Sequence, residues 1–237
     1  MSDHYERKLL DNEKIIQARS LVKKLRWSHG VESYGYEGPE SEDEKLKIKL
    51  QTKNNFEATG PITERNTLDE LIHSSLENDN TYLNYTCPWY SGKPIYSKMG
   101  DGGYFRSHHD HFSNGHYSTT IFLNEPDEYE GGELVLSLGG GIKKFKLPAG
   151  HAITYTTGTP HEVTEVTSGL RYVAVFWTKS IIPDTFMREL YSDISKVMDL
   201  FPDIVHPNIS DALKDPNFLL KGMRNKIKRH YSSDGMY

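Results

Sequence analysis

The sequence of 237 residues contains one cysteine, Cys87, and lacks any long apolar segment. A single cysteine excludes intrachain disulfides and metal sites built from several thiolates, so Cys87 is expected to be a buried, inert thiol. A membrane-spanning helix needs about 18 consecutive apolar residues, and a secretory signal needs an apolar centre where this chain begins with the charged stretch MSDHYERKLL. We therefore expect a cytoplasmic protein without a membrane partner.

Excess positive charge is also missing. The 28 Lys and Arg residues are outweighed by 33 Asp and Glu residues, which gives a net charge of -5, and proteins that bind nucleic acids or anionic membranes need a positive face. The basic stretch KGMRNKIKRH near the C-terminus carries Met223 and Ile227 at helical spacing, which is typical of the solvated side of a terminal helix. No nucleic-acid partner is expected.

Apolar periodicity predicts two helices and one strand in the first part of the chain. Residues 11–26 carry apolar side chains at helical spacing behind a capping Asp11, and residues 67–77 repeat this pattern. Residues 46–54, LKIKLQTKN, alternate apolar residues with lysines, as a half-buried strand does. The apolar face of the N-terminal helix is expected to pack against a sheet.

Between Pro94 and Lys179 the sequence changes to short β-branched and aromatic runs separated by turn residues, which is typical of an all-β sandwich or barrel. Eight strands are predicted, near residues 94–98, 103–107, 117–123, 133–138, 142–147, 151–156, 161–166 and 170–178. Helical periodicity returns after Pro183. We therefore expect an α+β, mainly β fold with a double-stranded β-helix (jelly roll) core. It forms one domain over residues 1–237, with N-terminal support from 1–92, the jelly roll in 93–182 and C-terminal helices in 183–237.

Residues 104–118, YFRSHHDHFSNGHYS, contain four histidines and one aspartate. Non-haem Fe(II) oxygenases bind their metal with two histidines and one carboxylate, and two of these ligands commonly come from a His-x-Asp triplet. Only His108-x-Asp110 has this form in the chain. A chain of this composition contains roughly one such triplet by chance, so its surroundings must carry the argument. It follows a predicted strand, and residues two apart in an extended segment face the same side, so both side chains can reach one ion.

A third ligand, His161, and a guanidinium, Arg171, occur together further along the chain. The stretch HEVTEVTSGLR predicts a tight hairpin whose three-residue loop ends on Gly169, where a positive φ is favoured. This register pairs Glu165 with Arg171 and places His161 and Arg171 on one face. A metal ligand and a guanidinium then line the same cavity.

This pairing suggests a co-substrate with a metal-chelating end and a distal carboxylate, because Arg binds carboxylates through a bidentate fork that Lys cannot copy. The compound 2-oxoglutarate has that shape, and Tyr96, on the strand that leads into the motif, can add a phenol donor. The other histidines of this region are not expected to bind the metal: His109, His111, His116 and His151. His109-x-His111 is similar to a cupin motif, but the glutamate that a cupin needs shortly afterwards is missing.

Three segments carry a family resemblance: YFRSHHD, TTIFLNEPDEYEGGELVL and KLPAGHAITYTTGTPHEVTEVTSGLRYVAVFW. Together they resemble the prolyl/lysyl-hydroxylase-type 2-oxoglutarate and Fe(II)-dependent dioxygenases, in particular the bacterial PKHD-type hydroxylases. The resemblance is strong over residues 94–182. It implies that His108, Asp110 and His161 are the catalytic iron ligands, that Arg171 anchors 2-oxoglutarate, and that Tyr96 binds the same co-substrate.

The resemblance also implies an activity. It indicates an enzyme that uses O2, converts 2-oxoglutarate to succinate and CO2, and hydroxylates an unactivated C–H bond with ascorbate as a supporting reductant. A prolyl residue of a protein or peptide is the implied substrate. Hydroxylation of a small molecule such as a free amino acid stays open, as does a catalytically silent metal or 2-oxoglutarate sensor. A nucleobase demethylase is disfavoured, because only Lys179 stands where a second Arg is typical. The oligomeric state stays open.

Overall fold

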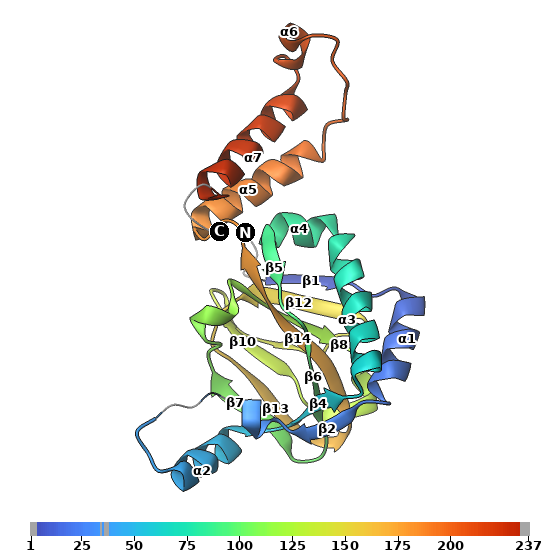
Figure 1. Ribbon diagram of the computed structural model, residues 1–237, viewed down its shortest axis with the longest axis vertical. Coiled ribbons are helices and arrows are strands. Elements are labelled where there is room, and N and C mark those ends of the chain that lie inside the picture. Colours follow the sequence, from blue (N-terminus) through green and yellow to red (C-terminus); the bar gives the residue numbers. More distant parts are fainter. Residues whose placement is uncertain (1–3, 34, 36–37, 233–237) are drawn as a thin grey trace. The chain divides into compact units, whose positions relative to one another are not determined.

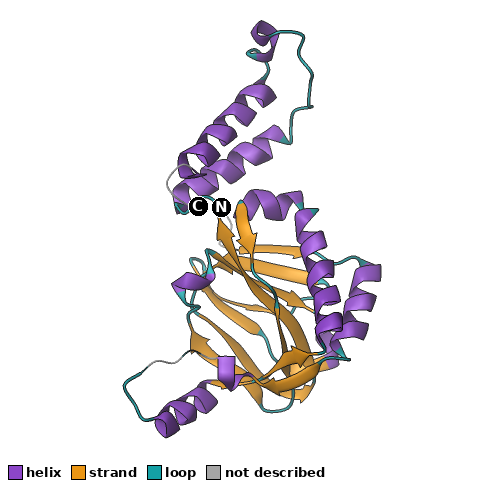
Figure 2. Cartoon of the chain, in the orientation of Figure 1, coloured by secondary structure: helices purple, strands orange, loops and turns teal. Residues whose placement is uncertain are grey.

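The computed structural model describes residues 4–33, 35 and 38–232, and the chain divides into two compact units (Figure 1, Figure 2). The core unit comprises Ser2–Asn78 and Ser91–Thr178, and the helical unit comprises Asp79–Tyr90 and Lys179–Tyr237. Residues 79–90 group with the C-terminal helices in the helical unit. The single domain expected over residues 1–237, with segments that end at residues 92 and 182, stays a prediction.

The core unit contains two antiparallel sheets. The first runs, in spatial order, β1 (His4–Lys8), β12 (His151–Thr156), β8 (Tyr117–Phe122), β14 (Arg171–Ser180), β6 (Ile95–Met99), β4 (Phe56–Gly60) and β2 (Arg26–His29). The second runs β11 (Gly141–Phe145), β10 (Leu134–Leu138), β13 (His161–Gly169), β7 (Gly103–His108) and β3 (Lys53–Asn54), with β9 (Tyr129–Gly131) also beside β13. All eight predicted strands are present, with ends displaced by a few residues at most, and the mainly β, jelly-roll-like fold is confirmed.

The hydrophobic core lies between the two sheets. Phe122 and Val173 come from the first sheet, and they pack in one cluster with Leu136 and Val163 from the second. On β10 alternate residues, Leu134, Leu136 and Leu138, enter this interior, as the pleat requires. Burial of each such side chain stabilises the fold by roughly 1.5–3 kcal/mol, so the scaffold is held by apolar packing.

Two helices, α1 (Asn12–Val22) and α3 (Ile62–Glu77), contact each other and lie beside the first sheet on the side away from the second (Figure 1). Both were predicted from apolar periodicity, and both are confirmed. The capping prediction is confirmed too, because the Asp11 side chain accepts a hydrogen bond from the Lys14 amide at 2.9 Å. α3 buries Leu68 and Ile72, so its apolar side is covered.

The strand predicted over residues 46–54 is wrong for most of its length. Residues Glu42–Thr52 form helix α2, and only Lys53 and Asn54 are extended. Ser41 and Glu44 form a reciprocal capping box at its N-terminus. The alternating pattern misled because Leu46 and Leu50 are also four residues apart, which is helical spacing. α2 buries none of its residues. Packing against a core therefore did not require a helical spacing of apolar residues along its whole length.

The hairpin predicted for residues 161–171 is also wrong, because β13 and β14 belong to different sheets. Arg171 is paired with Met99 of β6 instead of Glu165, and Val173 is paired with Phe122 of β8. The chain turns from one sheet to the other at Gly169, which has a φ of +78°. A Cβ there would lie 2.3 Å from the carbonyl oxygen of Glu128, so only glycine fits this corner.

The helical unit contains α4 (Asn80–Thr86), α5 (Thr185–Met198), α6 (Ile209–Ala212) and α7 (Pro216–Ser232). It also contains all of β5 (Pro88–Ser91) except Ser91, which belongs to the core unit. Its core consists of Cys87, Ile182, Tyr191 and Ile227. Burial raises the pKa of the Cys87 thiol, which agrees with the expected inert cysteine. The helices predicted after Pro183 are confirmed. None of the described helices is long and apolar enough to cross a membrane.

Three shorter 3-10 helices complete the described elements: η1 (Gly30–Ser33), η2 (Phe112–Asn114) and η3 (Pro126–Glu128). η2 follows the His-x-Asp motif directly. η3 precedes β9, and Glu125 and Glu128 form a capping box around it.

Candidate metal centre

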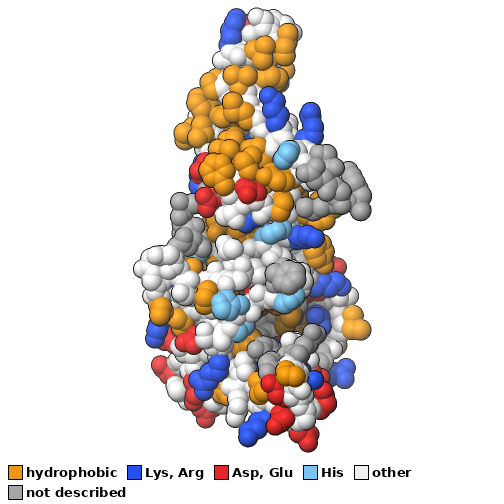
Figure 3. Space-filling model, turned by 90° about the vertical axis from the view of Figure 1, so that its left-hand side faces the viewer, with side chains coloured by type: hydrophobic (Ala, Val, Ile, Leu, Met, Phe, Trp, Pro, Cys, Tyr) orange, Lys and Arg blue, Asp and Glu red, His pale blue; other side chains and the backbone are white. Residues whose placement is uncertain are grey.

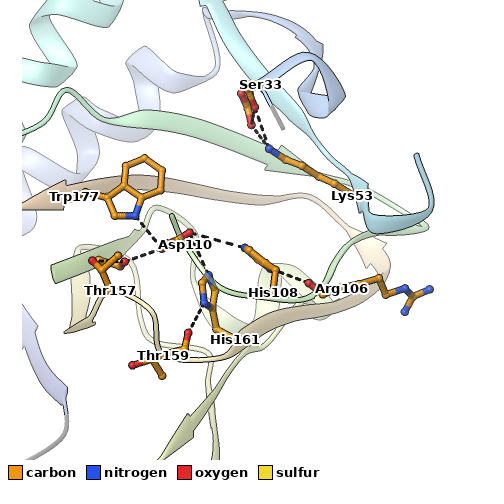
Figure 4. A network of polar contacts seen from close by, with 11 residues as sticks. Ser33, Lys53, Arg106, His108, Asp110, Thr157, Thr159, His161 and Trp177 are labelled. Atoms are coloured by element: carbon orange, nitrogen blue, oxygen red, sulfur yellow. Dashed lines mark hydrogen bonds and ion pairs between the residues drawn. The ribbon is translucent and has the colours of Figure 1, made fainter. Parts of the chain in front are cut away.

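Three side chains that could bind a metal converge in the core unit (Figure 4). His108 ends β7, Asp110 follows two residues later, and His161 begins β13. The ladder between β7 and β13 places His161 directly opposite His108. Asp110 Oδ1 lies 4.0 Å from Nε2 of His108 and 3.7 Å from Nε2 of His161. The ligand atoms all lie within 4.8 Å of one another, so the structure brings together the three residues that the sequence singled out.

Hydrogen bonds to backbone carbonyls orient both imidazoles. Nδ1 of His108 lies 2.8 Å from the carbonyl oxygen of Arg106, and Nδ1 of His161 lies 2.8 Å from that of Thr159. A carbonyl oxygen only accepts, so Nδ1 carries the proton in each ring and Nε2 keeps a free lone pair. Burial, together with the neighbouring His161, lowers the pKa of His108 to about 4. His108 is therefore a neutral imidazole near pH 7, as metal ligation requires.

Two donors from the first sheet hold the carboxylate of Asp110. Its Oδ2 accepts hydrogen bonds from Oγ of Ser118 at 2.7 Å and from Nε1 of Trp177 at 2.8 Å. Ser118 lies on β8 and Trp177 on β14, next to each other in that sheet. With Oδ2 occupied by these donors, Oδ1 is the oxygen that faces the two imidazoles (Figure 4). Sequence reasoning missed both residues.

The ring of His108 is also held from the side by Phe105. The two rings are stacked, with centroids 3.6 Å apart and an interplanar angle of 14°. Lys53 lies over Phe105, with Nζ 5.0 Å from the ring centroid, and it is fixed by an ion pair with Glu57 at 2.5 Å. The imidazole of His108 therefore has its plane set by packing and its tautomer set by hydrogen bonding.

Arg171 lies on the same strand as Trp177, six residues earlier, so both side chains face the interior between the sheets. Arg171 is only 2% exposed. Among the residues that the structure describes, no carboxylate forms an ion pair with it, and its Nε has no hydrogen-bond partner. Burial lowers its pKa, while Tyr129 and Tyr155 act in the opposite direction. A buried cation without an anion is costly, so this position suits an anionic ligand.

Tyr155 on β12 lies near both the metal cluster and the guanidinium. Its ring meets that of His161 edge-on, with centroids 5.5 Å apart. Burial raises its pKa well above the usual range, the Asp110 carboxylate raises it further, and Arg171 lowers it. Tyr155 is therefore a neutral phenol that feels both charged groups. Sequence reasoning missed it, because nothing in one sequence distinguishes it from the 14 other tyrosines.

The structure places Tyr96, the expected co-substrate donor, outside the interior that holds the metal cluster. Its side chain points away from the interior, toward α3, where its hydroxyl donates a hydrogen bond to Oδ1 of Asp69 at 2.7 Å. On β6, Met99 belongs to the inner core cluster, and Tyr96 has the opposite parity on this strand. The cluster does not include four other histidines of this region: His109, His111, His116 and His151.

The donor set fits ferrous iron. Two imidazole nitrogens and one carboxylate oxygen on one side of an ion leave further coordination positions open, which is the arrangement of non-haem Fe(II) oxygenases. The orphaned Nε of Arg171 fits the distal carboxylate of 2-oxoglutarate. The residues present are thus compatible with both groups.

Comparison with known families defines the class. The family model described as the 2OG-Fe(II) oxygenase superfamily matches residues 94–179, the segment that holds the metal cluster and Arg171. Fold, cluster and family match together define a 2-oxoglutarate- and Fe(II)-dependent dioxygenase.

Curated relatives narrow the class to a family. A PKHD-type hydroxylase of Gluconacetobacter diazotrophicus is 30% identical over 203 residues, which cover 81% of this chain and 85% of the relative. A PKHD-type hydroxylase of Acaryochloris marina is 36% identical over 146 residues, which cover 60% of this chain and 67% of the relative. The chain belongs to the PKHD-type hydroxylase family.

Solved structures share the fold. A prolyl-4-hydroxylase of Pseudomonas putida has a TM-score of 0.51 at 16% identity and covers 75% of this chain and 92% of its own. A prolyl hydroxylase of Trichoplax adhaerens, in complex with a peptide fragment of the hypoxia inducible factor oxygen degradation domain, has a TM-score of 0.54 at 14% identity. It covers 82% of this chain and 88% of its own. At such identities the likeness shows the fold alone.

Proposed function

We propose that this dioxygenase hydroxylates a prolyl residue of a protein or peptide, and that it releases succinate and CO2. The dioxygenase assignment depends on the cluster of His108, Asp110 and His161 and on Arg171, which is buried on the same interior and has no carboxylate partner among the described residues. The names of two proteins with the same fold support the prolyl substrate.

The three clustered residues are proposed to bind iron through Nε2 of His108, Oδ1 of Asp110 and Nε2 of His161. These are the atoms that the surrounding hydrogen bonds leave free. Iron, O2 and 2-oxoglutarate together supply the oxidising chemistry, as cofactors do. The protein contributes fixed ligand positions in a partly buried setting, where ligands need not reorganise when the metal binds.

Arg171 is proposed to bind the distal carboxylate of 2-oxoglutarate. The guanidinium is buried, stays charged near pH 7, and can donate two parallel hydrogen bonds to a carboxylate. Ion pairing with a bound dianion would remove the cost of burying this charge alone. The hydroxyl of Tyr129, which is buried and interacts with Arg171, is a second donor available to the same ligand.

Ascorbate is retained as a proposed reductant because the family resemblance implies it. The protein is also proposed to act in the cytoplasm, an expectation from the sequence alone. Ascorbate is tested by measuring turnover with and without it over successive cycles, and equal turnover in both cases would remove it from the account.

A substrate screen tests the proposed function. The iron-loaded protein is incubated with 2-oxoglutarate, O2 and a library of proline-containing peptides, and each peptide is examined by mass spectrometry for a gain of about 16 mass units. Matched peptides with alanine in place of proline are the control, and free amino acids form a second arm. Hydroxylated prolyl peptides with equal amounts of succinate support the proposal. Turnover of free amino acids alone would replace it with the small-molecule alternative, and tight metal binding without any succinate would favour a sensor.

A further inference from the structure

The helical unit exposes far more apolar surface than its size leads one to expect. Of the 21 large apolar side chains that are exposed among the described residues, 12 lie between Phe186 and Met223. Two of them in the connection between α5 and α6 are almost fully in solvent, Leu200 at 77% and Val205 at 97%. Figure 3 shows apolar side chains gathered on the surface of this unit.

The exposed side chains of α5 form a stripe. Phe186, Leu190 and Val197 are separated by four and seven residues, so they lie along one face of the helix. The other face buries Tyr191 and Ser195 inside the helical unit. The apolar stripe on the opposite face is left uncovered by the unit itself, although an apolar helix face is normally covered.

Helix α7 repeats this arrangement. It buries Ile227 in the core of the helical unit, while Leu219 and Met223, which are four residues apart, stay exposed. The two helices contact each other as a hairpin. Each therefore covers part of the other, and each keeps apolar side chains in solvent.

The apolar area is enough for a stable protein interface. If a large apolar side chain presents about 150 Å² when fully exposed, the 12 side chains together present on the order of 1,000 Å². The largest apolar patch of an ordinary monomer measures roughly 300–600 Å². A standard interface buries about 800 Å² on each partner, so covering most of this surface would meet that requirement.

The charges of the unit favour a second copy of the chain as the partner. Residues 184–215, which include α5, carry seven Asp and Glu residues against three Lys and Arg residues, and α7 carries none against five. An anionic membrane would be repelled by the acidic segment that bears most of the apolar side chains. A second copy of the chain has both an acidic α5 segment and a basic α7. In a two-fold symmetric pairing, the acidic segment of each copy would therefore lie against the basic α7 of the other.

We infer that the helical unit is a dimerisation surface, on which α5 and its connecting segment in one copy pack against α7 of a second copy. The pairing gives a four-helix arrangement in which the stripe of Phe186, Leu190 and Val197 is covered. This inference concerns assembly and is independent of the reaction proposed for the core unit.

Sedimentation velocity of the full chain from about 1 to 100 µM tests the inference directly. We expect a species of twice the monomer mass of 27.2 kDa, with its fraction rising with concentration. Phe186→Asp combined with Leu190→Asp should raise the dissociation constant at least 100-fold. Ile16→Asp is the matched control, because Ile16 of α1 is 71% exposed and Phe186 is 70% exposed; this variant should sediment as the wild type does.

A second measurement needs no variant, in case the double substitution impairs folding. Amide hydrogen exchange of the wild type at 1 and 100 µM should show greater protection of residues 186–205 at the higher concentration. A chain that stays monomeric at 100 µM overturns the inference, as does a dimer that the double variant leaves intact. Binding of the monomer to phosphatidylglycerol vesicles through this surface would assign it to lipid and would also overturn the inference.

Discussion

The indole of Trp177 should control how tightly the protein binds its metal. Nε1 of Trp177 donates to Oδ2 of Asp110 at 2.8 Å, and Oδ1 of the same carboxylate faces the two imidazoles. Trp177→Phe removes this donor and keeps an aromatic ring in the same place. The carboxylate of Asp110 is then free to turn, so its Oδ1 is no longer held facing the position of the metal ion.

The size of the effect follows from the contacts. A hydrogen bond to a charged group contributes about 1.5–3 kcal/mol, and Ser118 still holds the same oxygen at 2.7 Å. The loss should therefore lie near the lower end, at about 1.4 kcal/mol, which corresponds to a tenfold weaker metal complex. Removing a residue that hydrogen-bonds to a metal ligand generally lowers the metal affinity by about 10–100-fold, and the expected tenfold loss lies in this range.

Calorimetric titration of the metal-free protein with Mn(II), which is stable in air, measures this affinity without turnover. Trp27→Phe is the control, because Trp27 is a half-buried tryptophan of the same unit that packs on Tyr172. We expect Trp177→Phe to bind Mn(II) about tenfold more weakly and Trp27→Phe to bind as the wild type does. Equal affinity in Trp177→Phe and the wild type would show that the indole does not position the carboxylate.

Other substitutions separate the roles of neighbouring residues. Arg171→Met should keep Mn(II) affinity but raise the 2-oxoglutarate concentration for half-maximal succinate release at least 30-fold, because losing a buried charge pair costs about 2 kcal/mol or more. Asp110→Ala should abolish Mn(II) binding in the same titration while thermal unfolding changes little. Tyr96→Phe should lower the free energy of unfolding by about 1–3 kcal/mol, because it leaves Asp69 without its donor, at an unchanged 2-oxoglutarate requirement. His109→Ala, at an exposed position, should bind Mn(II) as the wild type does.

Each of these outcomes can fail separately. An unchanged 2-oxoglutarate requirement in Arg171→Met would remove the guanidinium from the co-substrate site. Its fold should survive, since replacing an unpaired buried charge by an apolar side chain of similar volume is often neutral or stabilising. A Tyr96→Phe variant that needs more 2-oxoglutarate would return Tyr96 to the site. Unfolding of Asp110→Ala at room temperature would mean that the core depends on this carboxylate.

Much of the core unit could be predicted because its strands and helices are marked in the local sequence. The eight strands follow from β-branched and aromatic runs bounded by turn residues, and the helices α1 and α3 follow from their apolar faces. α2 could not be predicted in the same way. It packs no residue into the core, so its apolar residues at 46, 48 and 50 fit a strand as well as a helix.

The candidate site was predictable only in part. His108, Asp110, His161 and Arg171 were found from motif and spacing, but the argument that joined His161 to Arg171 was wrong. They face one interior from two sheets, and they do not lie side by side in a hairpin. A glycine turn has the same local sequence whether it links paired strands or leads from one sheet to another, so the distinction is set by tertiary packing.

The residues that hold the ligands in place were beyond a single sequence. Ser118 and Trp177 are 59 positions apart and meet Asp110 only because β8 and β14 are neighbours in the first sheet. One signal was available for Trp177, because its even spacing from Arg171 on one predicted strand places both on the same face. Nothing comparable marked Tyr155 or Phe105.

Two histidines and one aspartate should bind a single metal ion while Arg171 binds the far end of 2-oxoglutarate. An anaerobic crystal structure with Mn(II) and 2-oxoglutarate, with the metal located by anomalous scattering, measures both contacts at once. We expect one ion bound by Nε2 of His108, Oδ1 of Asp110 and Nε2 of His161, with the distal carboxylate paired to Arg171. An ion bound elsewhere, or a co-substrate carboxylate that does not contact Arg171, would show that this assignment of the site is wrong.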